Sequence, residues 1–412
     1  MLGNVLFGAL YYILIYVTLF ISVFWFMIFF DKRDRMTKDP ANLKRTPGLT
    51  MIVPAYNEEK TLGRTVESVL NQDYPRNKLK VIIVDDASTD GTADVGREYA
   101  RKYPNVTFLR HRKNRRKAAA TNTGLRHVTT ELVGFIDADT ILEESDALIR
   151  SIGYFRNKRT GSVIATIKPM DTKTFSQKLQ RIEYTFTALV RKLLTFLGAL
   201  YMTPAFALYR TNLVRQLGGW DEDNFTEDLE MGLKLQNSGY KIEMSMNAAV
   251  KTNTPASFSK FWNQRIRWAR GFVYNSRKYT HMFFGKSFGH LGWFVLPTQY
   301  LVILLAIPVF IYGFFDALNS AYKAVVNYSL IGFDIPYILT HPISMNFNFF
   351  NLSLFLVTLV ALAALIKLGS KQINEKINKF EYILYIPLYP VVNIMVWMCV
   401  FYHEIRRSEY KW

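Results

Sequence analysis

Cysteine is nearly absent from this chain. Its 412 residues contain one, Cys399, which lies inside a long apolar segment. The six histidines are scattered, and none has the spacing of a metal-ligand pair. The sequence also shows no internal repeat and no low-complexity segment. The lack of cysteine excludes an internal disulfide framework and a thiolate metal site.

Acidic residues are also scarce. The 33 Asp and Glu stand against 51 Lys and Arg, which gives a net charge of +18. A basic surface can bind nucleic acid, but half of the residues are hydrophobic, and so hydrophobic a chain meets anionic lipid head groups first. A basic cleft would also suit a nucleotide sugar. We therefore expect membrane lipid and a nucleotide-sugar donor as partners, and no nucleic acid.

Charge is missing from several long stretches. Residues 6–30 are almost uninterrupted apolar sequence, followed at once by a charged run. This stretch is too long for the core of a signal peptide, and it has no basic n-region and no small-residue cleavage site. It predicts a membrane-spanning helix of about 20 residues; the alternative is a buried helix of a soluble domain. Residues 293–315, 347–366 and 382–401 predict three more spans, the last despite its two prolines.

The charges that flank these stretches predict the orientation. Four basic residues follow the first span (Lys32, Arg33, Arg35 and Lys38), and the 367–379 loop carries four lysines against one acid. Basic residues favour the cytoplasmic side, so residues 31–257 and this loop are expected there. Residues 325–339 are apolar but short, which predicts a loop or re-entrant segment on the far side. Four spans would put the tail HEIRRSEYKW outside, which conflicts with its three basic residues.

Between the first two spans, strands and helices alternate. Apolar strands are predicted at LTMIVPAYNE, LKVIIVDD, VTFLR and LVGFIDAD, and helices at EKTLGRTVESVL, ADVGREYARKY and KAAATNTGLRHV. This alternation is typical of a mostly parallel sheet covered on both faces. Ligands bind such sheets outside the carboxyl ends of the strands, where the polar clusters of this sequence stand.

Two acidic clusters end two of these strands. Asp85 and Asp86 close the second strand and could accept hydrogen bonds from a nucleotide base or ribose, although the sequence that follows also suits a simple turn. Asp137 and Asp139 close the fourth strand, where alternate residues can aim two carboxylates at one space. Hard divalent cations bind carboxylates together with substrate phosphates. A Mg²⁺ or Mn²⁺ ion at Asp139 would neutralise a diphosphate leaving group.

Two basic segments complete the pattern. Six Lys or Arg lie between Arg110 and Lys117; most suit a solvated loop, but Lys117 stands at a helix start and is expected to face a diphosphate. The segment FSKFWNQRIRWARGFV predicts an amphipathic helix at the membrane interface. Gln264, Arg267 and Trp268 are neighbours on it and offer an amide, a phosphate-binding fork and an aromatic platform for a sugar. The alternative is a helix that rests on the membrane with its arginines at head groups.

The segment NFTEDLEMGLKLQNSGY raises two interpretations. Thr226 can cap a helix and acids suit its positive end, so Glu227 and Asp228 need no catalytic role. Asp228 could instead be a catalytic base on the acceptor side. A helix N-terminus lowers the pKa of a carboxyl, so we expect Asp228 to be ionised at neutral pH, with the cap left to Thr226.

Six segments in order (PAYNEE, VDDASTDGT, KAAATN, DADT, TED and QRIRW) resemble the membrane-embedded family 2 glycosyltransferases, including hyaluronan, chitin, cellulose and poly-N-acetylglucosamine synthases. The resemblance covers residues 50–268, and the arrangement of spans is most similar to that of bacterial chitooligosaccharide synthases. It implies an α/β domain of GT-A type with a mixed, mostly parallel sheet, joined to an α-helical transmembrane region. It also implies an inverting mechanism and processive extension of a β-linked polymer.

The resemblance implies a role for each matching residue. The nucleotide site would comprise Ala55, Tyr56, Glu58, Asp85 and Asp86; Lys117 and Asp137 would contact the diphosphate, Asp139 would ligate Mg²⁺ or Mn²⁺, Asp228 would be the base, and Glu227, Gln264, Arg267 and Trp268 would hold the diphosphate and the acceptor sugar. Two departures concern the donor and acceptor: Arg116 stands where the family often has glycine, and Thr203-Pro204 replaces a small or glycine-rich stretch.

The sequence thus predicts four parts: a transmembrane helix (1–30), a glycosyltransferase domain (31–257), amphipathic interfacial helices (258–290) and a C-terminal transmembrane region of about three spans (291–412). UDP-N-acetylglucosamine is the first candidate donor, ahead of UDP-glucose and GDP-mannose. One alternative is transfer of a single sugar to a lipid acceptor. The other is a polymer-conducting subunit without catalysis, against which the acids at 86, 139 and 228 argue. A need for accessory export proteins stays open.

Overall fold

A computed structural model describes residues 2–330 and 349–406. Its centre is an eight-stranded sheet in the order β3-β2-β1-β4-β7-β6-β8-β5. The first four strands in the chain are those that the sequence predicts: β1 (Leu49–Ala55), β2 (Leu79–Asp85), β3 (Val106–Arg110) and β4 (Leu132–Ile136). They pair in parallel as β3-β2-β1-β4. The predicted mostly parallel sheet is therefore confirmed for this half of the domain.

The other half of the sheet makes it mixed. β7 (Phe206–Arg210) runs antiparallel to both β4 and β6 (Thr160–Pro169). β8 (Lys241–Thr252) is parallel to β6, and the short edge strand β5 (Thr140–Leu142) is antiparallel to β8. The predicted fold class, a mixed and mostly parallel sheet of GT-A type joined to apolar helices, is confirmed.

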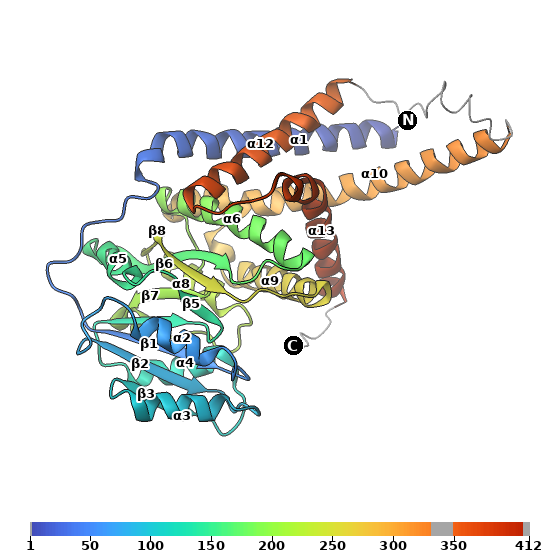
Figure 1. The fold of residues 1–412 in the computed structure, drawn as a ribbon. Coiled ribbons are helices and arrows are strands. Elements are labelled where there is room, and N and C mark those ends of the chain that lie inside the picture. Colours follow the sequence, from blue (N-terminus) through green and yellow to red (C-terminus); the bar gives the residue numbers. More distant parts are fainter. Residues whose placement is uncertain (1, 331–348, 407–412) are drawn as a thin grey trace.

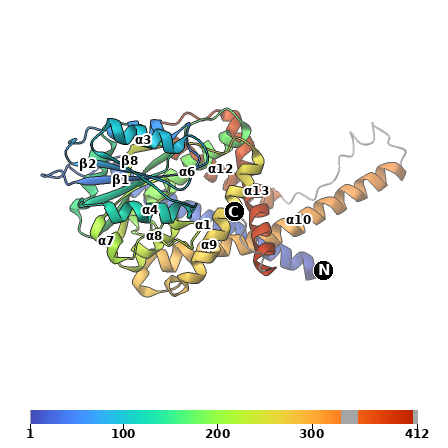
Figure 2. The ribbon, with the colours of Figure 1, turned by 90° about the horizontal axis from the view of Figure 1, so that it is seen from below.

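Helices cover both faces of the sheet, as Figure 2 shows. Every residue of β1 is buried, which explains its continuous apolar sequence. Its Val53 packs in one core with Val66 of α2, and its Ile52 packs in a second core with Ala120 of α4. The helices of this domain are α2 (Leu62–Leu70), α3 (Thr92–Lys102), α4 (Arg116–His127), α5 (Ala147–Gly153), α7 (Thr211–Gln216) and α8 (Glu227–Asn237).

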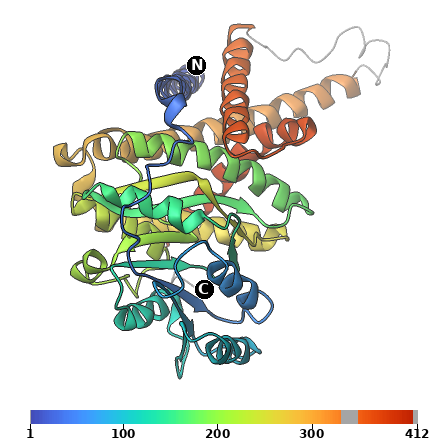
Figure 3. The same ribbon diagram turned by 60° about the vertical axis from the view of Figure 1, so that its left-hand side comes forward.

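Two longer helices lie between the sheet and the apolar helices. α6 (Phe175–Phe196) begins with a capping box formed by Thr174 and Gln177, and contacts β6 and β8 on one side and α12 on the other. α9 (Phe258–Lys278) is the predicted amphipathic helix, and it contacts α8 and α13. Figure 3 shows α1 and α12 on the side of α6 that faces away from the sheet. α6 is absent from the sequence prediction.

Four helices are long and apolar enough to cross a membrane: α1 (Leu2–Lys32), α10 (Leu296–Leu330), α12 (Phe349–Gln372) and α13 (Lys379–Ile405). α1 and α10 pack antiparallel, because Phe7 stacks on Tyr312 of α10 with ring centroids 4.1 Å apart, and Phe24 contacts Phe294, in the turn that leads into α10, at 4.5 Å. Short 3₁₀ or π turns complete the described elements at Arg33–Arg35, Tyr154–Arg156, Thr280–Met282, Lys286–Phe288 and Leu291–Val295.

One predicted loop is partly helical. Residues 325–330 continue α10, so the loop interpretation of the 325–339 segment is wrong for these six residues. The rest of that segment lies outside the described residues. Residues 325–330 contain no glycine or proline, the two residues least favourable in a helix interior.

Candidate active site

A cleft of about 500 Å³ opens beside the carboxyl ends of β1, β2 and β4. Its lining comes from the parallel half of the sheet, the first turns of α4 and α8, and the two interface helices α6 and α9. Segments far apart in the sequence therefore meet in one space. The predicted site residues that line this cleft are Ala55, Tyr56, Glu58, Asp86, Lys117, Asp137, Asp139, Glu227, Asp228, Gln264, Arg267 and Trp268.

Asp85 is the predicted site residue that does not line the cleft. It is fully buried, and its carboxylate pairs with Arg110 at 2.8 Å and accepts the backbone N–H of Ser88. Successive side chains of a strand point to opposite sides, so the adjacent Asp86 is the one that reaches the cleft. A nucleotide contact for Asp85 stays a prediction.

Asp86 shapes the loop that leads into α4. Its carboxylate accepts the backbone N–H of Arg115 at 2.9 and 3.1 Å and lies 2.7 Å from Nδ1 of His111. The other ring nitrogen of His111 lies 2.9 Å from the hydroxyl of Thr123 in α4. His111 thus links the end of β2 to α4, a role that the sequence analysis missed because a lone histidine in a basic run carries no distinctive signal.

Lys117 joins two of the predicted motifs. Its ammonium group lies 2.5 Å from Asp137 Oδ1 and 3.0 Å from Glu227 Oε1. Burial disfavours the charged form of this lysine, but the carboxylates of Asp137, Glu227 and Asp228 outweigh burial and raise its pKa. Lys117 is therefore a fixed positive charge in the cleft, between the acids after β4 and the first turn of α8.

The acids after β4 concentrate negative charge. Burial raises the pKa of both Asp137 and Asp139; Lys117 opposes the shift for Asp137, and the Glu58 carboxylate adds to the shift for Asp139. Asp139 Oδ1 also accepts hydrogen bonds from the hydroxyls of Thr140 and Thr252, at 3.2 and 3.3 Å. Carboxylates that burial and mutual repulsion disfavour in this way are suited to a bound cation.

Asp137 and Asp139 could supply some, but not all, of the ligands of a divalent cation. Within residues 2–330 and 349–406, no group of three or more His, Cys, Asp or Glu side chains could hold a metal ion. Asp139 and Asp137 offer carboxylate oxygens beside the cleft. Mg²⁺ is usually bound by one or two carboxylates together with substrate phosphates. The donor set thus fits a divalent ion that shares its coordination with a diphosphate.

The first turn of α8 holds Asp228 in the cleft. The backbone carbonyl of Asp228 accepts the hydroxyl of Thr203 at 2.9 Å and the N–H of the same residue at 3.2 Å. Its carboxylate accepts the N–H of Leu229 at 2.8 Å. Thr203 belongs to the segment in which this sequence departs from the glycine-rich pattern of the family it resembles, so that segment positions the candidate base.

Two expectations for this turn are wrong. Thr226 occupies the N-cap position, but its side chain makes no capping hydrogen bond to α8; it bonds Asn224 and Asn275 instead. The pKa of Asp228 is raised rather than lowered, by burial first and by the Glu227 carboxylate second, against the opposing charge of Lys117. Burial and a neighbouring carboxylate therefore outweigh the helix terminus.

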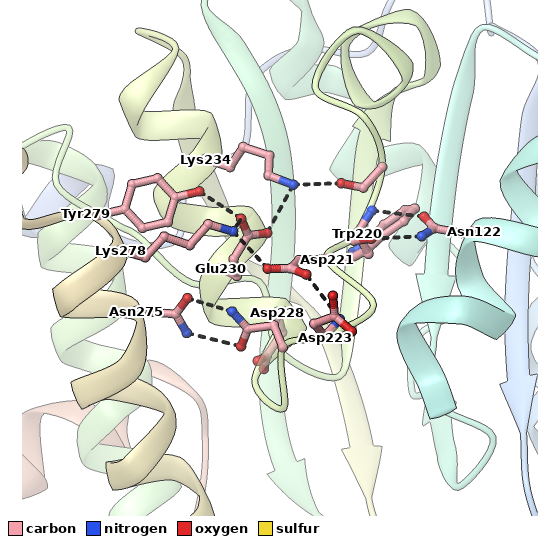
Figure 4. Close-up of polar contacts among 12 residues, drawn as sticks. Asn122, Trp220, Asp221, Asp223, Asp228, Glu230, Lys234, Asn275, Lys278 and Tyr279 are labelled. Atoms are coloured by element: carbon pink, nitrogen blue, oxygen red, sulfur yellow. Dashed lines mark hydrogen bonds and ion pairs between the residues drawn. The ribbon is translucent and has the colours of Figure 1, made fainter. Parts of the chain in front are cut away.

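A buried polar network fixes α8 against α9, as Figure 4 shows. Glu230 is fully buried. Its carboxylate pairs with the ammonium groups of Lys234 at 3.1 Å and Lys278 at 2.9 Å, and it accepts a hydrogen bond from the Tyr279 hydroxyl at 2.7 Å. Lys278 also pairs with Asp221 at 2.8 Å. A buried carboxylate is tolerated only when it is paired and hydrogen-bonded, so this network determines how the two helices meet beside the cleft.

Neighbouring contacts extend this network. Asn122, at the end of the KAAATN segment, donates to the Trp220 carbonyl at 2.8 Å and to Glu222 at 3.0 Å. On α9, Gly271 packs so closely on Thr226 that an added Cβ would lie 2.3 Å from its side chain. The loop before α8 is therefore held by both α4 and α9.

α9 presents Gln264, Arg267 and Trp268 to the cleft, as predicted. The arginines that flank them are not at the surface. Arg265 is buried, pairs with Glu183 of α6 at 2.5 Å, and lies over the Trp268 ring at 4.3 Å from its centroid. The alternative in which these arginines face lipid head groups is wrong for Arg265 and Arg270, because both are buried beside carboxylates.

α6 adds two lining residues that the sequence analysis missed, Tyr184 and Arg191. They lie seven residues apart, about two turns, and so share one face of the helix. Burial lowers the pKa of Arg191, and its Nε has no hydrogen-bond partner among the described residues. Arg191 therefore adds a further positive side chain to the cleft, beside Lys117 and Arg267. No recognised motif marks this helix in the sequence.

Unusual backbone conformations surround the cleft. Asn57, Ala87, Arg116 and Ala205 have positive φ angles of 56°, 63°, 72° and 57°. Non-glycine residues adopt this region at a cost of about 1–2 kcal/mol, and such residues cluster at functional sites. Arg116 stands where the family it resembles often has glycine, and its positive φ gives a physical reason for that glycine, which would adopt the same angle without strain.

Comparison with known proteins agrees with this geometry. Residues 50–218 match the family described as "Glycosyl transferase family 2". The poly-beta-1,6-N-acetyl-D-glucosamine synthase of Staphylococcus epidermidis is 27% identical over 267 residues, which are 63% of this chain and 64% of that enzyme. The synthase of the same name from Staphylococcus aureus is 30% identical over 268 residues, with the same two shares. The chain thus matches just under two thirds of the length of these relatives.

Two further similarities extend the comparison. A probable glycosyltransferase of Bacillus subtilis, YdaM, is 27% identical over 293 residues, which are 69% of this chain and 70% of that protein. Among solved structures, the mannosyltransferase PcManGT from Pyrobaculum calidifontis, in complex with GDP-Man and Mn²⁺, covers 85% of this chain and 98% of its own with a TM-score of 0.56. At 23% identity this second likeness supports the fold alone.

Proposed function

We propose that this chain, whose residues 50–218 match the family described as "Glycosyl transferase family 2", is a processive, inverting glycosyltransferase that extends a β-linked polysaccharide at a membrane from a nucleotide-sugar donor. The observation that carries the proposal is the single cleft. It brings together the acids after β4, Lys117, Asp228 and the Gln264-Arg267-Trp268 face of α9. A transferase of this kind needs a diphosphate site, a base and an acceptor platform in one space.

The proposed chemistry is one displacement. Asp228 takes the proton of an acceptor hydroxyl, whose oxygen bonds to C1 of the donor sugar on the face opposite the diphosphate. The C1–O bond to the diphosphate breaks, and its electron pair leaves with the nucleoside diphosphate. The raised pKa of Asp228 suits this role, since a base is most effective when its pKa lies near the working pH.

The proposed diphosphate site uses both cation and protein. Asp139, with Asp137 beside it, would hold Mg²⁺ or Mn²⁺, and such an ion neutralises the charge that develops on the leaving diphosphate. Lys117 and Arg267 line the same cleft and supply fixed positive charge to the phosphates. We place the nucleotide against Ala55, Tyr56, Glu58 and Asp86, at the ends of β1 and β2.

Trp268→Ala should shorten the polymer or abolish it. The ring offers an apolar face for an acceptor sugar, and Arg265, locked by Glu183, holds the ring in place. Product length measured by gel or mass spectrometry checks the prediction. Trp262→Ala is the matched control, because this tryptophan lies on α9 but does not line the cleft. Unchanged length and rate in Trp268→Ala would show that the ring is no platform.

The donor is proposed from the relatives' names. Two of them are poly-beta-1,6-N-acetyl-D-glucosamine synthases, which supports UDP-N-acetylglucosamine. The test is to incubate the purified protein in lipid with UDP-N-acetylglucosamine, UDP-glucose and GDP-mannose, with Mg²⁺ or Mn²⁺, and to read out nucleoside diphosphate and product length. A long product from the first donor supports the proposal. A single sugar on lipid would instead establish non-processive transfer, and no diphosphate release from any donor would contradict catalysis.

The sheet domain is proposed to face the cytoplasm. The basic residues that follow α1 (Lys32, Arg33, Arg35 and Lys38) support this orientation. In intact cells an impermeant maleimide should label a cysteine introduced near Asn327 and miss one introduced at Asp94 in α3. The opposite labelling pattern would overturn the orientation.

A further inference from the structure

Both ends of α13 are tied to the layer of helices that covers the sheet. At its start, Glu381 pairs with Arg181 of α6. Near its end, Glu404 pairs with Arg277 at 2.7 Å and with Arg270 at 3.4 Å, both on α9. α6 packs on β6 and β8, and α9 packs on α8. The two ends of α13 therefore lie on the same side of the molecule as the sheet domain.

This arrangement differs from that of a membrane-crossing helix. α13 has 27 residues and is therefore about 40 Å long, enough to cross a hydrocarbon core of about 30 Å. A crossing helix would place its two ends on opposite sides of the membrane. Figures 1 and 2 show α13 running across the direction of α1 and α10 rather than along it.

The C-terminal half of α13 packs along α9. Trp397 packs edge-on against Phe272 of α9, with ring centroids 6.1 Å apart. One stripe of α13 is buried against the protein: Tyr385, Val392, Val396, Trp397 and Val400. α13 thus lies along the two interface helices, α6 and α9, over much of its length.

The opposite face of α13 is apolar and uncovered. Its exposed large side chains include Ile383, Leu388, Met395 and Tyr402. Charged residues stand only near its two ends, where Lys379, Glu381, His403 and Glu404 lie. A face of this kind is suited to the boundary between head groups and acyl chains, with the polar ends at the water side.

We propose that α13 does not cross the membrane but lies on it, with its apolar face in the lipid of the leaflet that the sheet domain faces. α1, α10 and α12 are then the three crossing helices, and Arg406 lies on the same side as the sheet domain. The conflict between four spans and a basic tail disappears. α13 also clamps α9, and with it Gln264, Arg267 and Trp268, at the membrane surface. The proposal states only that both ends of α13 and the sheet domain lie on the same side of the membrane, so it does not depend on the proposed function.

Cysteine labelling in the full chain tests this placement. In a Cys399→Ala background, single cysteines replace Arg406, Asp94 and Ser320, all exposed; Asp94 marks the sheet domain and Ser320 the far part of α10. An impermeant maleimide is applied to intact cells and to inverted vesicles. We expect Arg406→Cys and Asp94→Cys to be labelled in the same preparation and Ser320→Cys in the other. Labelling of Arg406→Cys together with Ser320→Cys would overturn the proposal.

A cross-link tests the contact itself. Arg277→Cys and Glu404→Cys, together in the Cys399→Ala background, should be joined within one chain by a short bis-maleimide in native membranes. The control pair, Ser320→Cys with Glu404→Cys, should not be joined, because about 36 Å of helix separates residue 320 from the start of α10. Equal cross-linking of both pairs, or none in the first pair, would contradict the clamp.

Discussion

Removal of divalent cations with EDTA should abolish sugar transfer, and added Mg²⁺ or Mn²⁺ should restore it. Asp139→Ala should abolish transfer even with excess cation. The acids after β4 are half-buried and repel one another and Glu58, so the cleft without a cation disfavours a diphosphate. Loss of the metal's several kcal/mol of transition-state stabilisation corresponds to roughly 10²- to 10³-fold or more in rate. Diphosphate release checks both results.

The controls for this prediction separate metal binding from general damage. Asp94→Ala removes an exposed carboxylate of α3 whose ion pair within the described residues is with Arg97 on the same helix, so its rate should match that of the original chain. Binding of Mn²⁺, followed by its electron spin resonance in the presence of nucleoside diphosphate, should weaken in Asp139→Ala and not in Asp94→Ala. Full activity in EDTA, or in Asp139→Ala, would remove the metal from the mechanism.

The first half of the sheet domain could be predicted because each of its elements carries its own signal. β1, β2 and β4 are continuous apolar runs, and the helices between them show helical spacing. The second half of the sheet domain carries weaker local signals in its sequence. β5 has three residues, and β7 pairs antiparallel with β4, which lies some 70 residues earlier in the chain. Such long-range pairings depend on the assembled sheet and leave no local pattern.

α6 shows why the rest of the interface could not be predicted. Its buried face includes Gln180, Glu183 and Lys192, so it lacks a clean apolar stripe. These polar residues are buried because distant partners meet them: Pro255 and Arg265 near or on α9, and Met244 on β8. The same reason explains Arg270, whose partner Glu404 lies 134 residues away. From the sequence alone, a polar residue is predicted to be exposed unless its buried partner is already known.

Most of the candidate site, in contrast, could be placed from the sequence. The carboxyl ends of parallel strands lie at one edge of the sheet, so residues such as Asp86 and Asp139 could be expected to line one cleft, and they do. The strand register, however, decides which of two adjacent acids faces the cleft, and here Asp86 does while Asp85 pairs with Arg110. The pKa shift of Asp228 was predicted in the wrong direction, because the burial that raises this pKa is a property of the fold.

Asp228→Asn should reduce sugar transfer by roughly 10²-fold or more while it leaves donor binding almost unchanged. The amide keeps the size of the side chain and its hydrogen bond to the Leu229 N–H, but it cannot accept the proton of the acceptor hydroxyl. Asp223→Asn is the matched control: it makes the same change at an exposed acid five residues earlier. Initial rates of diphosphate release and equilibrium binding of UDP-N-acetylglucosamine measure the two effects separately.

The pH dependence supplies an independent check on the same residue. A base acts in its ionised form, so kcat/KM must fall as pH drops through the pKa of Asp228. Burial and the Glu227 carboxylate raise that pKa, while Lys117 and Arg267 oppose the shift. The acid limb of kcat/KM should therefore lie above the range of an ordinary aspartate, about 4, and Asp228→Asn should lose this limb together with the rate. If Asp228→Asn keeps near-original synthesis, or loses donor binding as fully as Asp139→Ala does, Asp228 is a structural acid of the first turn of α8, and the base must be sought elsewhere in the cleft.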